Sequence, residues 1–450
     1  MTDWKEVTTG LDYGSYAAWE AALEGPEPQF VPVFFRLRKS CRKDLSQSDA
    51  IREVTSLPTI AFSQHERNLL ETERVLAERC DWLHEVRGVL YCLRAAIEAL
   101  PDQVEVLQVG PAIARPDPLP LSQGLNLQET QGELDPEVPV FAVIDDGIGF
   151  LNARFRRSRL ETRFRALWFQ TAIRIEDPGI SKRDDIICGR VLTGEAIDAH
   201  LAAGGDEGEI YRQINRAVLP LTERAPTNRR IAHGTHVADL AAGTDPFRDD
   251  ALKAVPLLAV QLPPATVRET AGRRMESYLI QGLRWILAET LRQADRTDVP
   301  PLVVNLSIGS LAGPGDKTTF LADWFRYEIA RHARVGQGAE VRLVIAFGNA
   351  RKSRLAARAE LRGSSPLLLD WRVLPDDHTS SFVELRVDTG MTRGLQVTLT
   401  PPPGSALPAL AVDWPEGKKG WRLAVPEGPL AAATAVPERG GNRFCTWRLP

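Results

Sequence analysis

Four short segments of the chain carry side chains that could do chemistry, and each contains a glycine. They read VIDDGI at 143–148, IAHGTHVADLAAG at 231–243, LVVNLSIGS at 302–310 and VIAFGNA at 344–350. A carboxylate can orient an imidazole, a histidine can act as a general base, and an asparagine amide can donate to a developing oxyanion. These are the residue types that acyl-transfer chemistry uses.

Each segment also has an ordinary structural interpretation when it is taken alone. Asp145 could cap a turn after a strand, and Asn349 could belong to a plain Gly-Asn turn. His233 and His236 could be ordinary residues at the start of a helix. Because residues three apart share one helical face, they could also bind a metal ion, with Asp145 and Asp146 as further ligands.

The elements that must position these residues alternate along the chain. Continuous apolar runs, typical of strands buried on both faces of a parallel sheet, occur at 140–144, 255–260, 302–306 and 343–347. Helical stretches are expected between and after them, at 194–203, 233–242, 276–292 and 319–333. This alternation predicts a doubly wound α/β fold, in which sites lie at the carboxyl ends of the strands.

In their order and placement, the four segments resemble the subtilisin-like (S8) family of serine peptidases. The intact HGTHVA sequence that begins at His233 is the most specific part of this resemblance. The resemblance implies that Asp145 orients the base, that His233 is the base and that Asn349 helps to form the oxyanion hole. It also implies that Ser307 and Gly309 lie on an edge segment that pairs with the backbone of a peptide substrate.

The resemblance covers about residues 138–350, and the sequence departs from the family pattern at three positions. Asp146 stands where the family usually has Ser or Thr. Asp239 replaces a glycine, and Phe347 occupies a position where a small residue is usual. These departures leave the Asp and His segments assignable.

The resemblance also implies a nucleophilic serine in a G-T-S-x-A-x-P motif at the start of a helix, and residues 350–450 contain no such motif. Ser405 lies in GSALP, but three prolines precede it and no long helical pattern follows. We therefore expect a serine endopeptidase whose nucleophile lies outside this chain. The alternative is a catalytically inactive pseudopeptidase that acts as a protein-binding module.

Changes of composition along the chain predict four parts. A small α+β N-terminal domain is expected at 1–115, followed by a Pro-rich linker at 116–137. The subtilisin-like core is expected at 138–375, with an insertion at 151–230. An antiparallel β-sandwich-like domain, which ends incomplete, is expected at 380–450. The N-terminal domain could act as an intramolecular prodomain or recruit a partner.

The N-terminal domain shows strand and helix patterns. Strands are expected at 30–37 and 104–109, and helices at 64–84 and 86–100. The small α+β class of this domain depends on that pattern.

Composition narrows the partners. The chain has 450 residues, a net charge of -4 and five cysteines at wide spacings, so nucleic-acid binding, a zinc site and a disulfide framework are not indicated. It contains no signal-peptide pattern and no long apolar run. We therefore expect a cytoplasmic protein, without metal or cofactor, that acts on a peptide or protein substrate and not on nucleic acid or membrane.

Overall fold

The computed structural model describes most of the chain. The described residues are 4–7, 30–39, 45–77, 85–110, 134–170, 174–175, 186–187, 189–218, 232–248, 251–263, 275–294, 298–309, 319–346, 348, 357, 359–360, 365–372, 381–387, 395–401, 403–404, 408–413, 419–425, 428–437 and 443–449. Residues 116–133 of the expected linker at 116–137 lie outside these ranges. No described helix combines the length and the apolar character that crossing a bilayer requires.

A six-stranded sheet with the order β10-β7-β11-β6-β12-β13 lies at the centre of the molecule. Its strands are β6 (Val140–Asp145), β7 (Phe164–Phe169), β10 (Arg190–Thr193), β11 (Leu257–Gln261), β12 (Leu302–Leu306) and β13 (Val341–Ile345). All neighbours pair in parallel except β10, which is antiparallel to β7. The predicted α/β class with a mostly parallel sheet is confirmed.

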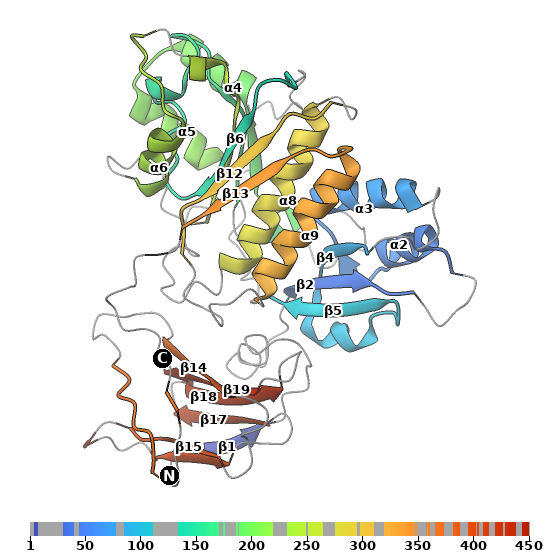
Figure 1. Ribbon diagram of the computed structural model, residues 1–450, viewed down its shortest axis with the longest axis vertical. Coiled ribbons are helices and arrows are strands. Elements are labelled where there is room, and N and C mark those ends of the chain that lie inside the picture. Colours follow the sequence, from blue (N-terminus) through green and yellow to red (C-terminus); the bar gives the residue numbers. More distant parts are fainter. Residues whose placement is uncertain are drawn as a thin grey trace.

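Helices cover both faces of this sheet (Figure 1). They are α4 (Gly194–Ala203), α5 (Glu207–Val218) and α6 (His233–Ala242) on one face, and α8 (Met275–Gln293) and α9 (Phe320–Val335) on the other. Side chains of β6 alternate between the two cores. Ala142 and Ile144 pack with α8, whereas Val143 packs with α6. This burial on both sides explains the continuous apolar run of β6.

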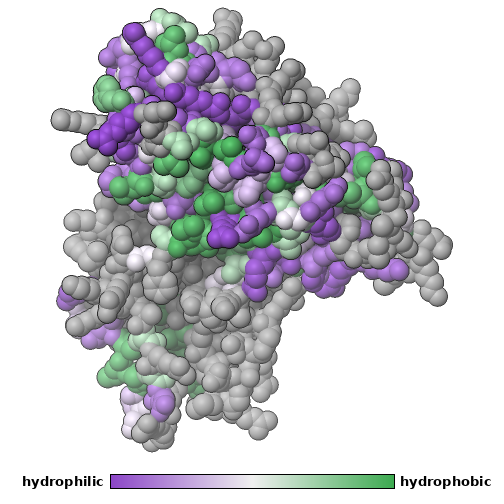
Figure 2. Space-filling view, turned by 45° about the horizontal axis from the view of Figure 1, so that its top comes forward, coloured by the Kyte–Doolittle hydropathy of each residue, from purple (hydrophilic) through white to green (hydrophobic). Residues whose placement is uncertain are grey.

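The face that carries α6 is less well covered over β12 and β13. On this face Val303 and Asn305 are only partly buried, and Arg342 and Val344 are exposed. Strand β13 is also the last strand of the sheet among the described residues. Figure 2 shows apolar side chains gathered across the middle of one side of the molecule, below a polar region.

The segment expected as an insertion at 151–230 contributes to the central sheet. Strand β7 lies between β10 and β11, inside the sheet. The remaining short elements of this region and of the next connection are η2 (Ala153–Phe155), β8 (Arg174–Ile175), β9 (Ile186–Ile187) and η4 (Ala251–Ala254). The run FRALWF is short, and arginines precede it and interrupt it. Its apolar pattern is therefore weak, and the sequence did not predict this strand.

The N-terminal part contains a four-stranded antiparallel sheet with the order β3-β4-β2-β5. Its elements are β2 (Phe30–Leu37), α2 (Gln47–Ser56), β3 (Ile60–Ala61), α3 (Gln64–Ala77), β4 (Arg87–Leu93), η1 (Arg94–Ala99) and β5 (Val104–Val109). The helix predicted at 86–100 is wrong, because this segment forms β4 and η1. Periodicity does not separate strand from helix in a short apolar run, and pairing with β2 and β3 on either side favours the strand.

The N-terminal sheet packs on α8 and α9, which lie between it and the central sheet (Figure 1). Arg284 of α8 forms ion pairs with Glu66 of α3, at 2.8 Å, and with Glu328 of α9. The hydroxyl of Tyr91 on β4 donates to Oε1 of Gln281 on α8 at 2.8 Å. This interface is therefore built from buried polar pairs as well as apolar contacts.

The C-terminal part forms antiparallel sheets. A five-stranded sheet has the order β1-β17-β18-β19-β14, and β15 pairs with β16. The strands are β1 (Trp4–Val7), β14 (Ser381–Val387), β15 (Gln396–Leu399), β16 (Leu410–Asp413), β17 (Lys419–Val425), β18 (Gly428–Pro437) and β19 (Arg443–Leu449). Strand β1 comes from the N-terminus, so this sheet joins the two ends of the chain (Figure 1).

Candidate active site

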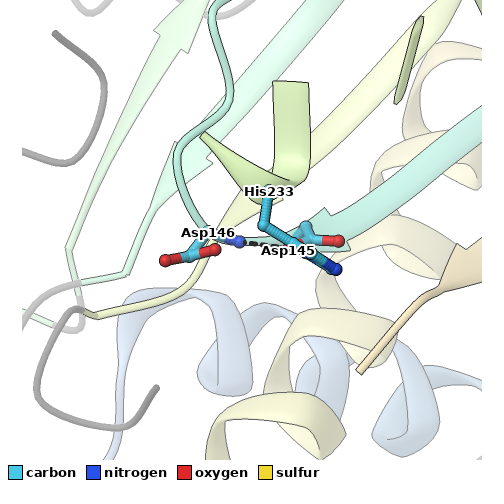
Figure 3. A group of neighbouring side chains, drawn as sticks. All are labelled: Asp145, Asp146 and His233. Atoms are coloured by element: carbon cyan, nitrogen blue, oxygen red, sulfur yellow. Dashed lines mark hydrogen bonds and ion pairs between the residues drawn. The ribbon is translucent and has the colours of Figure 1, made fainter. Parts of the chain in front are cut away.

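The structure brings Asp145 and His233 together. Asp145 is the last residue of β6, and His233 is the first residue of α6. Nδ1 of His233 lies 2.7 Å from Oδ1 of Asp145 (Figure 3). The Asp145 side chain is 0% exposed, whereas that of His233 is 55% exposed. A buried carboxylate thus holds one nitrogen of an imidazole whose ring is open to solvent.

Close backbone approach positions the start of α6. The N–H of Gly234 donates to the carbonyl oxygen of Asp146 at 2.7 Å. A Cβ atom at Gly234 would lie 2.2 Å from that oxygen, so any larger residue would push the helix away from the β6 turn. The turn itself uses Gly147 at a φ of 65°, a conformation that favours glycine.

Thr235 fastens the same turn with its hydroxyl group. Its Oγ1 donates to the carbonyl oxygen of Gly147 at 2.5 Å and accepts from the N–H of Gly149 at 2.7 Å. Its own N–H also donates to Gly147, at 3.1 Å. The Gly-Thr pair that follows His233 therefore ties α6 to the loop after β6.

Burial is the dominant influence on the Asp145 carboxyl group and raises its pKa. The hydrogen bonds from His233 and from the N–H of Asp146, at 2.8 Å, act in the opposite direction. Its second oxygen, Oδ2, has no hydrogen-bond partner within the described part of the chain. The carboxylate can thus fix the Nδ1–H tautomer of His233 and leave Nε2 available to accept a proton.

Three of the four residues that we considered as metal ligands also lie close together. Asp145, Asp146 and His233 offer one ligand atom each within 4.8 Å of one another. Among the described residues, His236 is not part of this cluster. A four-ligand site of the kind considered from the sequence is therefore not assembled.

The departure from the family pattern at Asp239 has a structural partner. Asp239 on α6 forms an ion pair with Arg154 of η2. The carbonyl oxygen of Arg154 in turn accepts from the N–H of Thr244, just after α6, at 2.9 Å. These contacts join the far end of α6 to the loop that follows Asp145.

The expected substrate-binding residues lie at the carboxyl end of β12. Ser307 is partly buried, and its Oγ accepts from Nδ2 of Asn305 at 3.0 Å. A Cβ atom at Gly309 would lie 3.1 Å from Cα of Gly348, so the third and fourth sequence segments come close together. Asn349 lies outside the described residues.

Two other residues singled out from the sequence, Phe347 and Ser405, also lie outside the described residues. Sequence reasoning missed Gln261, a fully buried amide at the end of β11. A glutamine at the end of an apolar run was the available signal, but its place beside Asp145 depends on strand register.

The site thus belongs to a mixed α/β protein in which a buried carboxylate and an exposed imidazole meet at the carboxyl end of a central strand. No family model matches the sequence, and no curated protein matches it. Among solved structures, the chain is similar to the CspB protease of Clostridium perfringens, with 15% identity and a TM-score of 0.39. The similarity covers 70% of this chain and 57% of that one, so the chain spans less than two thirds of this distant neighbour.

Proposed function

We propose that the protein is a subtilisin-like serine endopeptidase of the S8 family, which hydrolyses peptide bonds in a protein or peptide substrate. One observation carries the proposal: the hydrogen bond between Asp145 and His233 at the carboxyl end of a parallel strand. In parallel α/β sheets the reactive groups lie at the carboxyl ends of the strands. The solvent-exposed ring of His233 leaves room for a nucleophile and a substrate.

In this proposal His233 takes the proton of a serine hydroxyl as the serine attacks the scissile carbonyl carbon, and later gives that proton to the leaving amine. Asp145 keeps the imidazole in the required tautomer and stabilises its cation. Asn349 and a backbone N–H bind the oxyanion of the tetrahedral intermediate. Ser307 and Gly309 belong to the segment that pairs with the substrate backbone.

The nucleophile is proposed to be a serine that lies outside this chain. The open sheet face over β12 and β13 supports this proposal, because it lies on the Asp145 side of the sheet. Val303 and Asn305 are only partly buried there, and Val344 is 52% exposed. A helix that begins with the serine and packs on this face would complete the triad.

The N-terminal part is proposed to act as an intramolecular prodomain. Its α3 and β4 pack on α8 and α9, which lie on the sheet face opposite the Asp145 side chain. The contacts therefore suit a role in stabilising the helices of the core.

Peptide hydrolysis by the full-length protein tests the proposal. His233→Ala and Asp145→Asn should each lower kcat by about 10⁴-fold, because each removes a member of the triad. His236→Ala, on the same helix, should leave the rate unchanged. A metal chelator should have no effect. Hydrolysis that does not depend on His233 would contradict the proposal.

Two other functions make different predictions in the same assay. The three-residue cluster of Asp145, Asp146 and His233 would favour a metal-dependent hydrolase if a chelator abolished hydrolysis and a divalent ion restored it. The absence of a serine motif from 350–450 would favour a pseudopeptidase if a folded protein bound peptides without cleaving them.

A further inference from the structure

A buried glutamine lies directly beside Asp145. Gln261 is the last residue of β11 and is the register partner of Asp145 in the parallel pair β11–β6. It is the one polar residue of this strand, and its side chain is fully buried like those of its apolar neighbours. A buried amide destabilises a core unless its polar atoms are hydrogen-bonded, so its partners indicate its role.

The side chain of Gln261 bonds to the turn that carries Asp145 and to the residue that follows β11. Its Oε1 accepts from the N–H of Ile148 at 2.9 Å, and its Nε2 donates to the carbonyl oxygen of Leu262 at 3.1 Å. The N–H of Leu262 donates to the carbonyl oxygen of Asp145 at 2.9 Å. The amide therefore joins the Ile148 end of the turn to β11, while the backbone of Leu262, which the same amide contacts, joins the Asp145 end.

The opposite side of this turn is held by α6. Gly234 and Thr235 directly follow His233. The N–H of Gly234 donates to the carbonyl oxygen of Asp146, and the N–H and hydroxyl of Thr235 donate to that of Gly147. The turn is thus held between Gln261 on one side and the first residues of α6 on the other. Movement of the turn would change the position of His233 relative to Asp145.

We infer that Gln261 is a positioning residue, which fixes the Asp145–Ile148 turn so that Asp145 and His233 meet in hydrogen-bonding geometry. The inference deepens the proposed function and rests on it. Gln261 touches neither His233 nor the place of a substrate in this account. It acts through the turn, and its effect should therefore appear in the His233 imidazole even when no peptide is cleaved.

Nuclear magnetic resonance of the full chain, with ¹⁵N-labelled histidine, provides the test. The chain has seven histidines, and the signal of His233 is assigned by its loss in His233→Gln. In Gln261→Met, which keeps the side-chain length without the amide, the Nδ1–H proton should exchange with solvent about tenfold faster, as expected when one buried hydrogen bond is lost. An unchanged exchange rate would overturn the inference.

Gln170→Met is the matched control. Gln170 follows β7 at the same end of the sheet and is 1% exposed, but its Nε2 donates to the carbonyl oxygen of Tyr278. This variant should keep the exchange rate of the unsubstituted protein, and an equal acceleration would also overturn the inference.

A second variant covers the case in which Gln261→Met does not fold. Gln261→Asn keeps an amide but withdraws it from Ile148, and it should show the same faster exchange. If the unsubstituted protein has no protected Nδ1–H proton on His233, the Asp145–His233 pair of the proposed function fails. If that proton is present but insensitive to both Gln261 variants, only the positioning role fails.

Discussion

Two clusters of charged side chains join separate elements of this protein, and they differ in exposure. In the interface cluster, Arg284 is 1% exposed and its partners Glu66 and Glu328 are 3% and 1% exposed. In the candidate active site, Asp145 is fully buried but His233 is 55% exposed. One cluster is closed on all sides, and the other opens to solvent at its basic member.

The two clusters also differ in what their basic members can do. A guanidinium group keeps its proton at any ordinary pH, so Arg284 can stabilise packing but cannot act as a base. An imidazole gains and loses a proton near neutral pH. A buried acid–base pair therefore needs an accessible, titratable member before it can do chemistry. Four predictions test this contrast.

The largest effect is expected at Arg284. Arg284→Met leaves two buried carboxylates without their cation and should lower the free energy of unfolding by about 3–5 kcal/mol. Arg342→Met is the control, because Arg342 pairs with Glu340 at an exposed site and should change stability by less than about 1 kcal/mol. Urea unfolding measures both, and equal effects would remove the distinction between buried and exposed pairs.

Acid should weaken the same interface through two histidines. Burial, together with nearby arginine side chains (Arg284 and Arg331 at His65, Arg331 at His332), lowers the pKa of His65 from 6.5 to about 3 and that of His332 from 6.5 to about 4. The unfolded chain therefore binds more protons than the folded chain between these values and 6.5, so stability falls as the pH falls through this window. From pH 7 to pH 5 the loss should be about 2 kcal/mol for each histidine.

The variant His65→Gln/His332→Gln isolates that contribution. Burial raises the pKa of Glu66, which favours the folded state as the pH falls and partly offsets the histidines. The test is therefore the difference between the two proteins. Urea unfolding at pH 7 and pH 5 should show a smaller loss in the double variant. An identical loss in both proteins would contradict the prediction.

A glycine pair contrasts the site with the core. Gly234→Ala places a Cβ atom against the carbonyl oxygen of Asp146 and should lower stability by about 1–3 kcal/mol while separating His233 from Asp145. Gly282→Ala, in α8, meets side chains at ordinary contact distance, 3.4 Å or more, and should be neutral or stabilise the helix by up to about 1 kcal/mol. Thermal unfolding distinguishes the two, and equal destabilisation would show that the close approach at Gly234 is unimportant.

The smallest effect is expected for the ion pair between Arg154 and Asp239. The two side chains are 43% and 31% exposed, so solvent screens their attraction. Arg154→Met should therefore change the free energy of unfolding by less than about 1 kcal/mol. A larger loss would indicate that this pair holds α6 in place as strongly as the Gly234 and Thr235 contacts.

Local patterns in the sequence predicted the elements that carry the site. The apolar run before Asp145 predicted β6, and the HGTHVA segment predicted the start of α6. The prediction of a helix at 86–100 is wrong because β4 pairs with β2 on one side and with β3 on the other. Gln261 and Arg284 both contact residues that are far apart from them in the chain. A single sequence does not show which distant residues become neighbours, so neither arrangement could be predicted from it. The roles of Ser307, Gly309 and Asn349 stay predictions.

Covalent labelling of the full-length protein with a fluorophosphonate tests the central claim most directly, because the reagent reacts with a serine only when a base activates it. We expect labelling of one serine of the full-length protein that lies outside this 450-residue chain, and loss of labelling in both His233→Ala and Asp145→Asn. The label should be unaffected by Ser405→Ala. Labelling that persists without His233, or no labelling of the folded protein, would contradict the proposal that Asp145 and His233 form the base of a serine peptidase.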